Sequence, residues 1–147
     1  MKRIIVALAL LAVSSLAVAQ TSKWRQGDSI LKPNVGVLVP GHGYRLIPFI
    51  DKESGKIGFL GNSSSLVVAV PPTYDDGYFS IYMLMPVLKD GKWGVMDLGA
   101  RYTPEGHHYT DPIIPCVYDK VEVVDNDHVR VYRNGESYVR EISTGMN

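Results

Sequence analysis

A short pattern of residues occurs twice in this chain and constrains its fold more than any other feature. Residues 56–60 read Lys-Ile-Gly-Phe-Leu, and residues 92–96 read Lys-Trp-Gly-Val-Met. Each follows a turn that contains glycine, and each is preceded by an apolar stretch with a central proline. A glycine inside a strand marks a bulge or the close approach of another segment. The pattern predicts repeated β-hairpins in which a large ring, that of Trp93, covers Gly94 or Gly58 of a neighbouring strand.

A second element also occurs twice, as Val-Pro-Pro-Thr-Tyr-Asp over residues 70–75 and as Ile-Pro-Cys-Val-Tyr-Asp over residues 114–119. Because proline cannot donate to a strand ladder, the prolines belong at strand starts or sheet edges. The tyrosines are expected just inside a sheet, with the aspartates turning the chain. The expected structural positions of the repeat are Trp93, Gly94, Gly58, Tyr74, Asp75, Tyr118 and Asp119.

The remainder of the chain after residue 20 favours strands and turns. Apolar residues alternate or form short blocks, and glycine and proline recur between them, which is typical of an all-β chain. Asp90-Gly91 and Asn134-Gly135 each stand between two apolar runs and predict two-residue type I′ hairpins. We therefore expect an all-β fold, a small sheet or curled β-meander of repeated hairpins, with a three-strand meander over residues 120–142.

Lys92-Trp93-Gly94, followed by the segment at 114–119, resembles the WG-repeat family, also called KWG repeats. The resemblance covers about residues 47–140, with Ile57 in place of the tryptophan in the first copy and a long loop at 99–112 in the second. It implies a β-rich repeat domain of a kind common in bacterial exported and surface proteins. It implies no catalytic residues, because the family has none that are known.

The first residues have the pattern of a secretory signal peptide. Lys2 and Arg3 precede an unbroken apolar run at 4–13, and Ala17-Val18-Ala19 offers small residues before a cut at Gln20. The apolar run is too short to span a membrane, which takes roughly 20 residues. We expect a signal peptide at 1–19, a lead-in at 20–33, the β domain at 34–143 and a tail at 144–147. The protein is then periplasmic or extracellular, with no transmembrane helix in the mature chain.

Charge and cysteine content exclude some classes of partner. Basic and acidic residues are balanced, at 15 each, and no cluster of Lys and Arg occurs in the mature part. Nucleic acid and anionic membrane are therefore not expected as partners. The sequence contains one cysteine, Cys116, so no disulfide within the chain can form. We expect no cofactor, and a protein or glycan partner in the cell envelope.

The loop at 99–112 is the expected place for function, because it is an insertion relative to the first copy and function concentrates on loops. Its candidate binding residues, together with two tyrosines that precede it, are Tyr102, His107, His108, Tyr109, Tyr78 and Tyr82. Glu105 and Asp111 add carboxylates to these candidates, and Cys116 adds a thiol. No metal site is expected, since adjacent histidines on a strand point to opposite faces and no set of four ligands has a recognisable spacing.

The sequence thus predicts an exported β domain with a binding or structural role and no identifiable catalytic site. The alternative is a small exported hydrolase with a His or carboxylate site in the 99–112 loop. Convergence of His107, His108, Glu105 and Cys116 in one deep pocket would favour the hydrolase, and their separation would favour binding.

Overall fold

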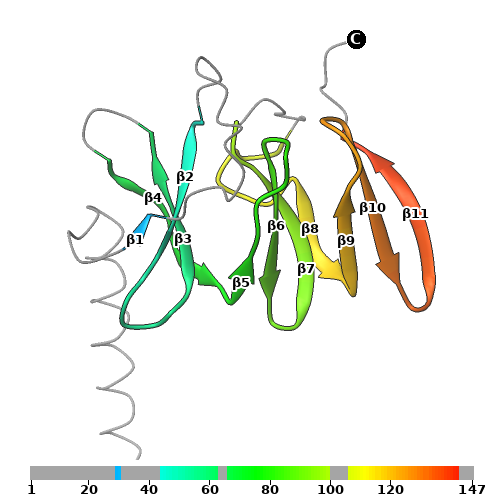
Figure 1. Cartoon of the computed structure of the whole chain (residues 1–147), viewed down its shortest axis with the longest axis horizontal. Helices are drawn as coiled ribbons and strands as arrows, with labels where there is room; N and C mark the ends of the chain where they lie inside the picture. The colour runs from blue at the N-terminus through cyan, green and yellow to red at the C-terminus, as the bar shows by residue number, and fades with distance from the viewer. Residues whose placement is uncertain (1–28, 31–43, 63–65, 100–105, 143–147) are drawn as a thin grey trace, which may run out of the picture.

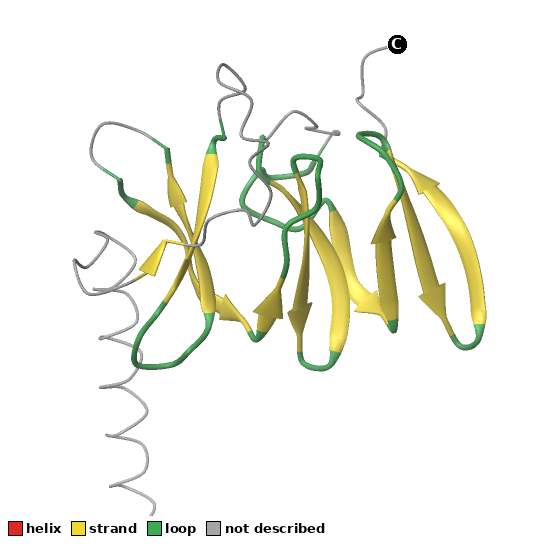
Figure 2. Ribbon diagram, viewed as in Figure 1, coloured by secondary structure: helices red, strands yellow, loops and turns green. Residues whose placement is uncertain are grey.

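Three small antiparallel sheets stand in a row in the computed structural model of this protein (Figures 1 and 2). The structure describes residues 29–30, 44–62, 66–99 and 106–142. These residues form strands, turns and loops without a helix, so the expected all-β class is confirmed. Within that part of the chain, no helix has the length and apolar character to cross a membrane.

The strands follow the chain from one end of the row to the other. The first sheet has the order β1-β2-β3-β4 and the second β5-β6-β7-β8, whereas the third has the order β11-β10-β9. The first sheet contains β1 (Ser29–Ile30), β2 (Leu46–Ile50), β3 (Ile57–Gly61) and β4 (Val68–Tyr74). The second contains β5 (Asp76–Gly77), β6 (Leu84–Lys89), β7 (Lys92–Asp97) and β8 (Ile114–Tyr118). The third contains β9 (Lys120–Val123), β10 (His128–Arg133) and β11 (Glu136–Glu141).

The chain crosses between sheets at two tyrosine–aspartate pairs. Tyr74 ends β4 and Asp75 leads into β5, while Tyr118 ends β8 and Asp119 leads into β9. Where a small sheet or curled β-meander of repeated hairpins was expected, the strands form three separate sheets. The physical reason lies at these aspartates, where the chain leaves one edge strand and begins the next sheet instead of continuing the same ladder.

Both predicted two-residue hairpins are confirmed. Asp90 and Gly91 have φ values of 51° and 77°, and Asn134 and Gly135 have values of 53° and 79°. Positive φ at both central positions is what a type I′ turn requires, and asparagine, aspartate and glycine tolerate it best. The three-strand meander predicted over 120–142 is also present, as β9, β10 and β11.

Other boundaries differ from the expected ones. β4 continues through Pro71 and Pro72 to Tyr74, so these prolines lie inside a strand and not at its start. It can do so because β4 is an edge strand, where a missing N–H costs no ladder bond. No sequence pattern predicted β1. This strand lies in the segment expected to be a lead-in, and it pairs with β2. The first residues of the expected β domain, 34–43, lie outside the described residues.

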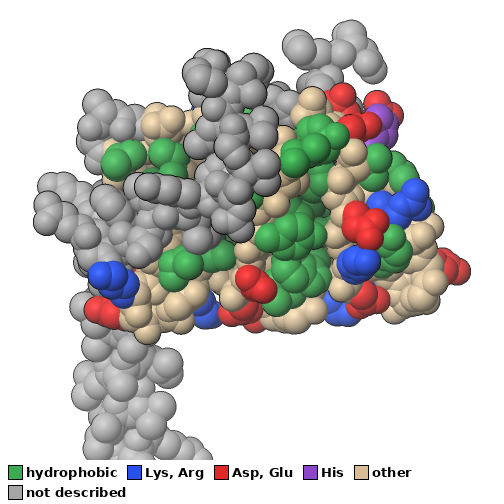
Figure 3. All heavy atoms as spheres, in the orientation of Figure 1, with side chains coloured by type: hydrophobic (Ala, Val, Ile, Leu, Met, Phe, Trp, Pro, Cys, Tyr) green, Lys and Arg blue, Asp and Glu red, His purple; other side chains and the backbone are tan. Residues whose placement is uncertain are grey.

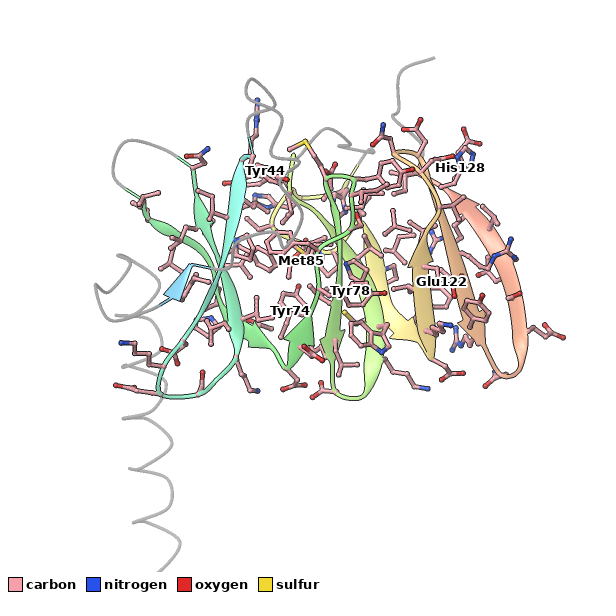
Figure 4. The ribbon with its side chains drawn as sticks, viewed as in Figure 1. Tyr44, Tyr74, Tyr78, Met85, Glu122 and His128 are labelled. Atoms are coloured by element: carbon pink, nitrogen blue, oxygen red, sulfur yellow. The ribbon has the colours of Figure 1, made fainter. Side chains whose placement is uncertain are left out.

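The core consists of apolar layers between the sheets. One layer joins the first two sheets and includes Phe59, Tyr74, Met85 and Met96. A second layer joins the second and third sheets and includes Val95, Tyr118, Val121 and Val131. Figure 4 shows Tyr74 and Met85 directed into the space between the first two sheets. A third cluster, Phe49, Leu60 and Val68, lies on the other face of the first sheet.

These layers explain why the sequence changes its pattern along the chain. The middle sheet is covered on both faces, so Leu84 to Val87 are all buried and apolar. The third sheet is covered on one face only, so β10 alternates between buried valines at 129 and 131 and more exposed residues between them. The pattern of apolar residues in a strand thus reflects whether one or both faces of its sheet are covered by another sheet.

Candidate functional site

A groove lies where the first and second sheets meet beside the 106–112 loop. It encloses about 640 Å³ and takes residues from the end of β4, the β6–β7 hairpin, the loop and β8. We call it the β4–β8 groove. Its lining residues are Val70, Thr73, Tyr74, Lys89, Asp90, Lys92, Thr110, Asp111, Pro112, Pro115, Cys116 and Val117.

Charges of both signs face this groove. Lys92 already has an ion-pair partner, because its ammonium pairs with the carboxylate of Asp119. Lys89, Asp90 and Asp111 line the groove without an ion-pair partner within the described part of the chain. They come from different elements, Lys89 from the end of β6, Asp90 from the β6–β7 turn and Asp111 from the loop. The groove therefore offers one cation and two anions to a ligand.

Cys116 lies half-buried in the groove, on the face of β8 that packs against the first apolar layer. Its Sγ lies 3.8 Å from the carbonyl oxygen of Val87. Burial raises the pKa of the thiol, and the nearby Lys89 only partly offsets that effect. The protonated thiol is a weak nucleophile, because the thiolate is the reactive form.

Tyr74 forms the buried floor beside Cys116. Its ring packs edge-on against Phe59 at 5.8 Å, and its hydroxyl donates to the Met96 sulfur at 3.6 Å. Burial raises the pKa of the Tyr74 hydroxyl well above its usual value. Because the side chain is only 4% exposed, it offers no ring surface to a ligand.

The histidines of the loop do not reach the groove lining. His107 is half-buried and His108 is exposed, and neither belongs to the lining residues. His108 stacks on the Tyr109 ring at 5.0 Å, and its Nδ1 lies 2.6 Å from the Thr110 hydroxyl oxygen. Tyr109 itself is 41% exposed. The loop thus contributes to the groove through Thr110 to Pro112 and not through its histidines.

Two further candidates, Tyr102 and Glu105, lie outside the described residues. In the described part of the chain, no three His, Cys, Asp or Glu side chains gather as metal ligands would. The sequence analysis did not predict Lys89 and Thr73 as site residues, because nothing in the local sequence pattern distinguishes a groove-lining residue from an exposed one.

Asp75 and Asp119 make closely corresponding contacts. Asp75 pairs with Lys56 at 3.5 Å and accepts a hydrogen bond from the backbone N–H of Asp90 at 3.1 Å. Asp119 pairs with Lys92 and accepts a bond from the backbone N–H of Asn134 at 3.0 Å. In both cases the carboxylate and the N–H are 15 residues apart. Each aspartate therefore links the lysine of one hairpin to the turn of the next.

The two strand glycines are covered by groups other than the Trp93 ring. A Cβ on Gly58 would lie 2.8 Å from the Phe49 ring and 2.7 Å from the Val70 carbonyl oxygen. A Cβ on Gly94 would lie 2.4 Å from the Ile114 carbonyl oxygen. The expectation that Trp93 covers Gly58 is wrong, and since successive strand residues point to opposite faces, Trp93 does not cover Gly94 either.

Trp93 packs instead between the second and third sheets. Its ring meets Tyr78 edge-on at 5.6 Å, and the Tyr78 hydroxyl donates to the Val121 carbonyl oxygen at 3.1 Å. Tyr78 remains 47% exposed, and Tyr82 is half-buried. Figure 3 shows hydrophobic side chains gathered over the middle of the face on which Figure 4 places Tyr78.

The buried carboxylates belong to turns. Asp51 is 3% exposed, and its Oδ2 accepts bonds from the Ser54 hydroxyl at 2.6 Å and backbone N–H at 3.1 Å. Asp97 is 5% exposed and accepts a bond from the Gly99 N–H at 3.1 Å. Both carboxylates stabilise the chain reversal that follows a strand, so neither points to a reaction.

Fold and groove together define an all-β protein of three small antiparallel sheets with a groove between the first two that has both apolar and charged lining residues. Comparison with family models, with curated proteins and with solved structures finds no match to the chain.

Proposed function

We propose that this is an exported WG-repeat-like protein that binds a polypeptide segment in the β4–β8 groove. The observation that carries the proposal is the set of charges of both signs that line the groove without ion-pair partners among the described residues, namely Lys89, Asp90 and Asp111. A ligand with both acidic and basic groups satisfies charges of both signs. Peptides supply such pairs readily.

A glycan fits this groove less well. Sugar rings are commonly held by stacking on exposed aromatic faces, whereas the one aromatic side chain among the groove residues, Tyr74, is almost fully buried. Pro112 and Pro115 give the groove rigid apolar walls instead. Apolar walls with a few polar groups are typical of ligand sites that are largely formed before the ligand binds.

The repeated contacts of Asp75 and Asp119 support the repeat character. In both cases an aspartate pairs with a lysine and accepts a hydrogen bond from a turn N–H 15 residues further along the chain. A lone hairpin is marginal in water, so linked units that share apolar layers gain stability together. The groove then lies at the junction of two units, where loop insertions add contacts at little cost to the scaffold.

The hydrolase alternative has no specific support among the described residues. His107 and His108 do not line the groove that contains Cys116, and the raised pKa of the Cys116 thiol disfavours the thiolate. We therefore propose binding alone.

The single cysteine makes the proposal testable without a known ligand. Hexapeptides selected from a random display library against the folded protein are added during reaction of Cys116 with a chromogenic disulfide. Peptides held in the groove are expected to slow that reaction. Lys89→Glu and Asp111→Lys should each weaken binding, whereas Arg130→Glu, on a strand of the third sheet, should not.

The proposal fails if no peptide is enriched. It also fails if the enriched peptides leave the rate of Cys116 modification unchanged and bind the Lys89 and Asp111 variants as well as the original protein.

A further inference from the structure

The outer edge of β11 is an exposed strand edge at the end of the row of sheets (Figure 1). Within the described residues, β11 pairs with β10 and no strand pairs with its other side. Tyr138 is 53% exposed and Val139 is 42% exposed. Such an edge presents unpaired N–H and C=O groups together with apolar side chains, and it is a natural template for another strand.

In the other two sheets, the second strand of the corresponding hairpin has a partner strand on its outer edge. β3 is paired by β4 and β7 by β8, and both pairings shift register at the strand glycine. At that point the partner backbone approaches so closely that a Cβ on Gly94 would lie 2.4 Å from the Ile114 oxygen. In β11 the corresponding position is Tyr138, whose side chain excludes the same irregular approach.

A regular strand remains compatible with β11. β10 and β11 pair without any register shift from His128 to Arg133. Arg133 and Glu136 close a two-residue hairpin, so they form a hydrogen-bonded pair, and the pairs alternate from there. The N–H and C=O groups of Ser137 and Val139 therefore point outward, available to an incoming strand.

Charge selects a second copy of β11 as that strand. In an antiparallel pair centred on Tyr138, Ser137 of each copy lies opposite Val139 of the other and exchanges outward hydrogen bonds with it. Glu136 then lies opposite Arg140 of the second copy, and this happens twice by symmetry. Opposite charges directly across two strands are stabilising, and like charges are destabilising.

We propose that this protein forms a two-fold symmetric homodimer by antiparallel pairing of β11 with β11 of a second copy, centred on Tyr138. Pairing covers the exposed Tyr138 and Val139 side chains. Arg140 donates to the Tyr118 hydroxyl at 3.0 Å, and that hydroxyl lies 3.2 Å from the Tyr138 hydroxyl. These contacts hold Arg140 on the face shared with Glu136, and its guanidinium retains further donors.

The first test measures molar mass against concentration for the exported protein, by analytical ultracentrifugation. The original protein is expected to shift from monomer to dimer as concentration rises. Val139→Pro removes one outward N–H and should abolish the dimer, while Val139→Thr keeps the N–H and should preserve it. Thermal melts of the two variants check that both remain folded.

A charge-reversal experiment tests the register. Glu136→Arg and Arg140→Glu each place like charges across the proposed dimer and should weaken self-association about tenfold or more. Mixed together, the two variants restore opposite charges at both positions. The mixture should therefore form a heterodimer with an affinity similar to that of the original homodimer.

A protein that stays monomeric up to its solubility limit overturns the proposal. So does a dimer that persists in folded Val139→Pro, because its interface then lies elsewhere. Failure of the two charge variants to associate on mixing, while each remains folded, contradicts the register centred on Tyr138. None of these results bears on peptide binding in the β4–β8 groove.

Discussion

Replacement of Gly94 by alanine tests why a strand in this fold contains glycine. The added Cβ would lie 2.4 Å from the Ile114 carbonyl oxygen and 2.8 Å from the Cys116 backbone nitrogen. Real Cβ contacts essentially never fall below 3.0 Å, so β8 must retreat by more than half an ångström. The two contacts are with backbone atoms, so no rotation of a flexible side chain relieves the clash.

The expected cost combines two effects. Overpacking in a filled interior costs about 1–3 kcal/mol. Displacement of β8 also weakens hydrogen bonds of the β7–β8 ladder, at about 1 kcal/mol each. We therefore expect Gly94→Ala to lower the free energy of unfolding by about 3 kcal/mol, which corresponds to a fall in Tm of roughly 10–20 °C for a domain of this size.

Gly61→Ala provides the matched control. Gly61 also lies in a strand, but its added Cβ would meet its nearest atom, the Val67 carbonyl oxygen, at an ordinary 3.6 Å. This variant should be neutral or stabilised by about 0.5 kcal/mol, because alanine reduces the entropy of the unfolded chain. Circular dichroism melts and urea titrations measure both variants. Equal stability of Gly94→Ala and Gly61→Ala would refute the close-approach argument.

Three further predictions concern the ion pairs and the tryptophan. Asp119→Ala should speed hydrogen exchange at the Asn134 amide, because that amide donates to the Asp119 carboxylate. Ion pairing and hydrogen bonds lower the pKa of Asp119, so the contribution of this carboxylate to stability should fade as pH falls below about 4. His128 should titrate by NMR above its usual value of about 6.5, because hydrogen bonding to Asp125 raises the pKa of the imidazole. Its stabilising effect is then present below that value and lost as pH rises through the raised pKa, and Asp125→Asn should return the titration towards normal. Trp93→Ala should cost about 2–3 kcal/mol in chemical denaturation, below the 3–5 kcal/mol of a fully buried tryptophan, and an unchanged midpoint would contradict its packing role.

Local chemistry in the sequence determined the all-β class and the hairpins. Asp90-Gly91 and Asn134-Gly135 specify type I′ turns because few other residue pairs tolerate positive φ twice in succession. The alternating valines of β10 specify one buried face. These signals are readable because each depends on residues that are adjacent in the chain.

The candidate site could be predicted only in part. The 99–112 loop was expected to contribute, and Thr110 to Pro112 do line the groove, but the expected histidines do not. Lys89 joins them from a separate hairpin. Its position depends on how the second sheet packs against the first, and no local pattern records that packing.

Tertiary structure also decided what the strand glycines are for. The repeated Lys-x-Gly pattern located Gly58 and Gly94 from sequence alone, yet the groups that cover them come from distant segments, the Phe49 ring in one case and the β8 backbone in the other. The division into three sheets likewise arises at Asp75 and Asp119, whose carboxylates each join two hairpins. Sequence therefore determined the all-β class and the two type I′ turns, because those preferences are local. The tertiary structure decided which strands meet, because that depends on apolar layers assembled from the whole chain.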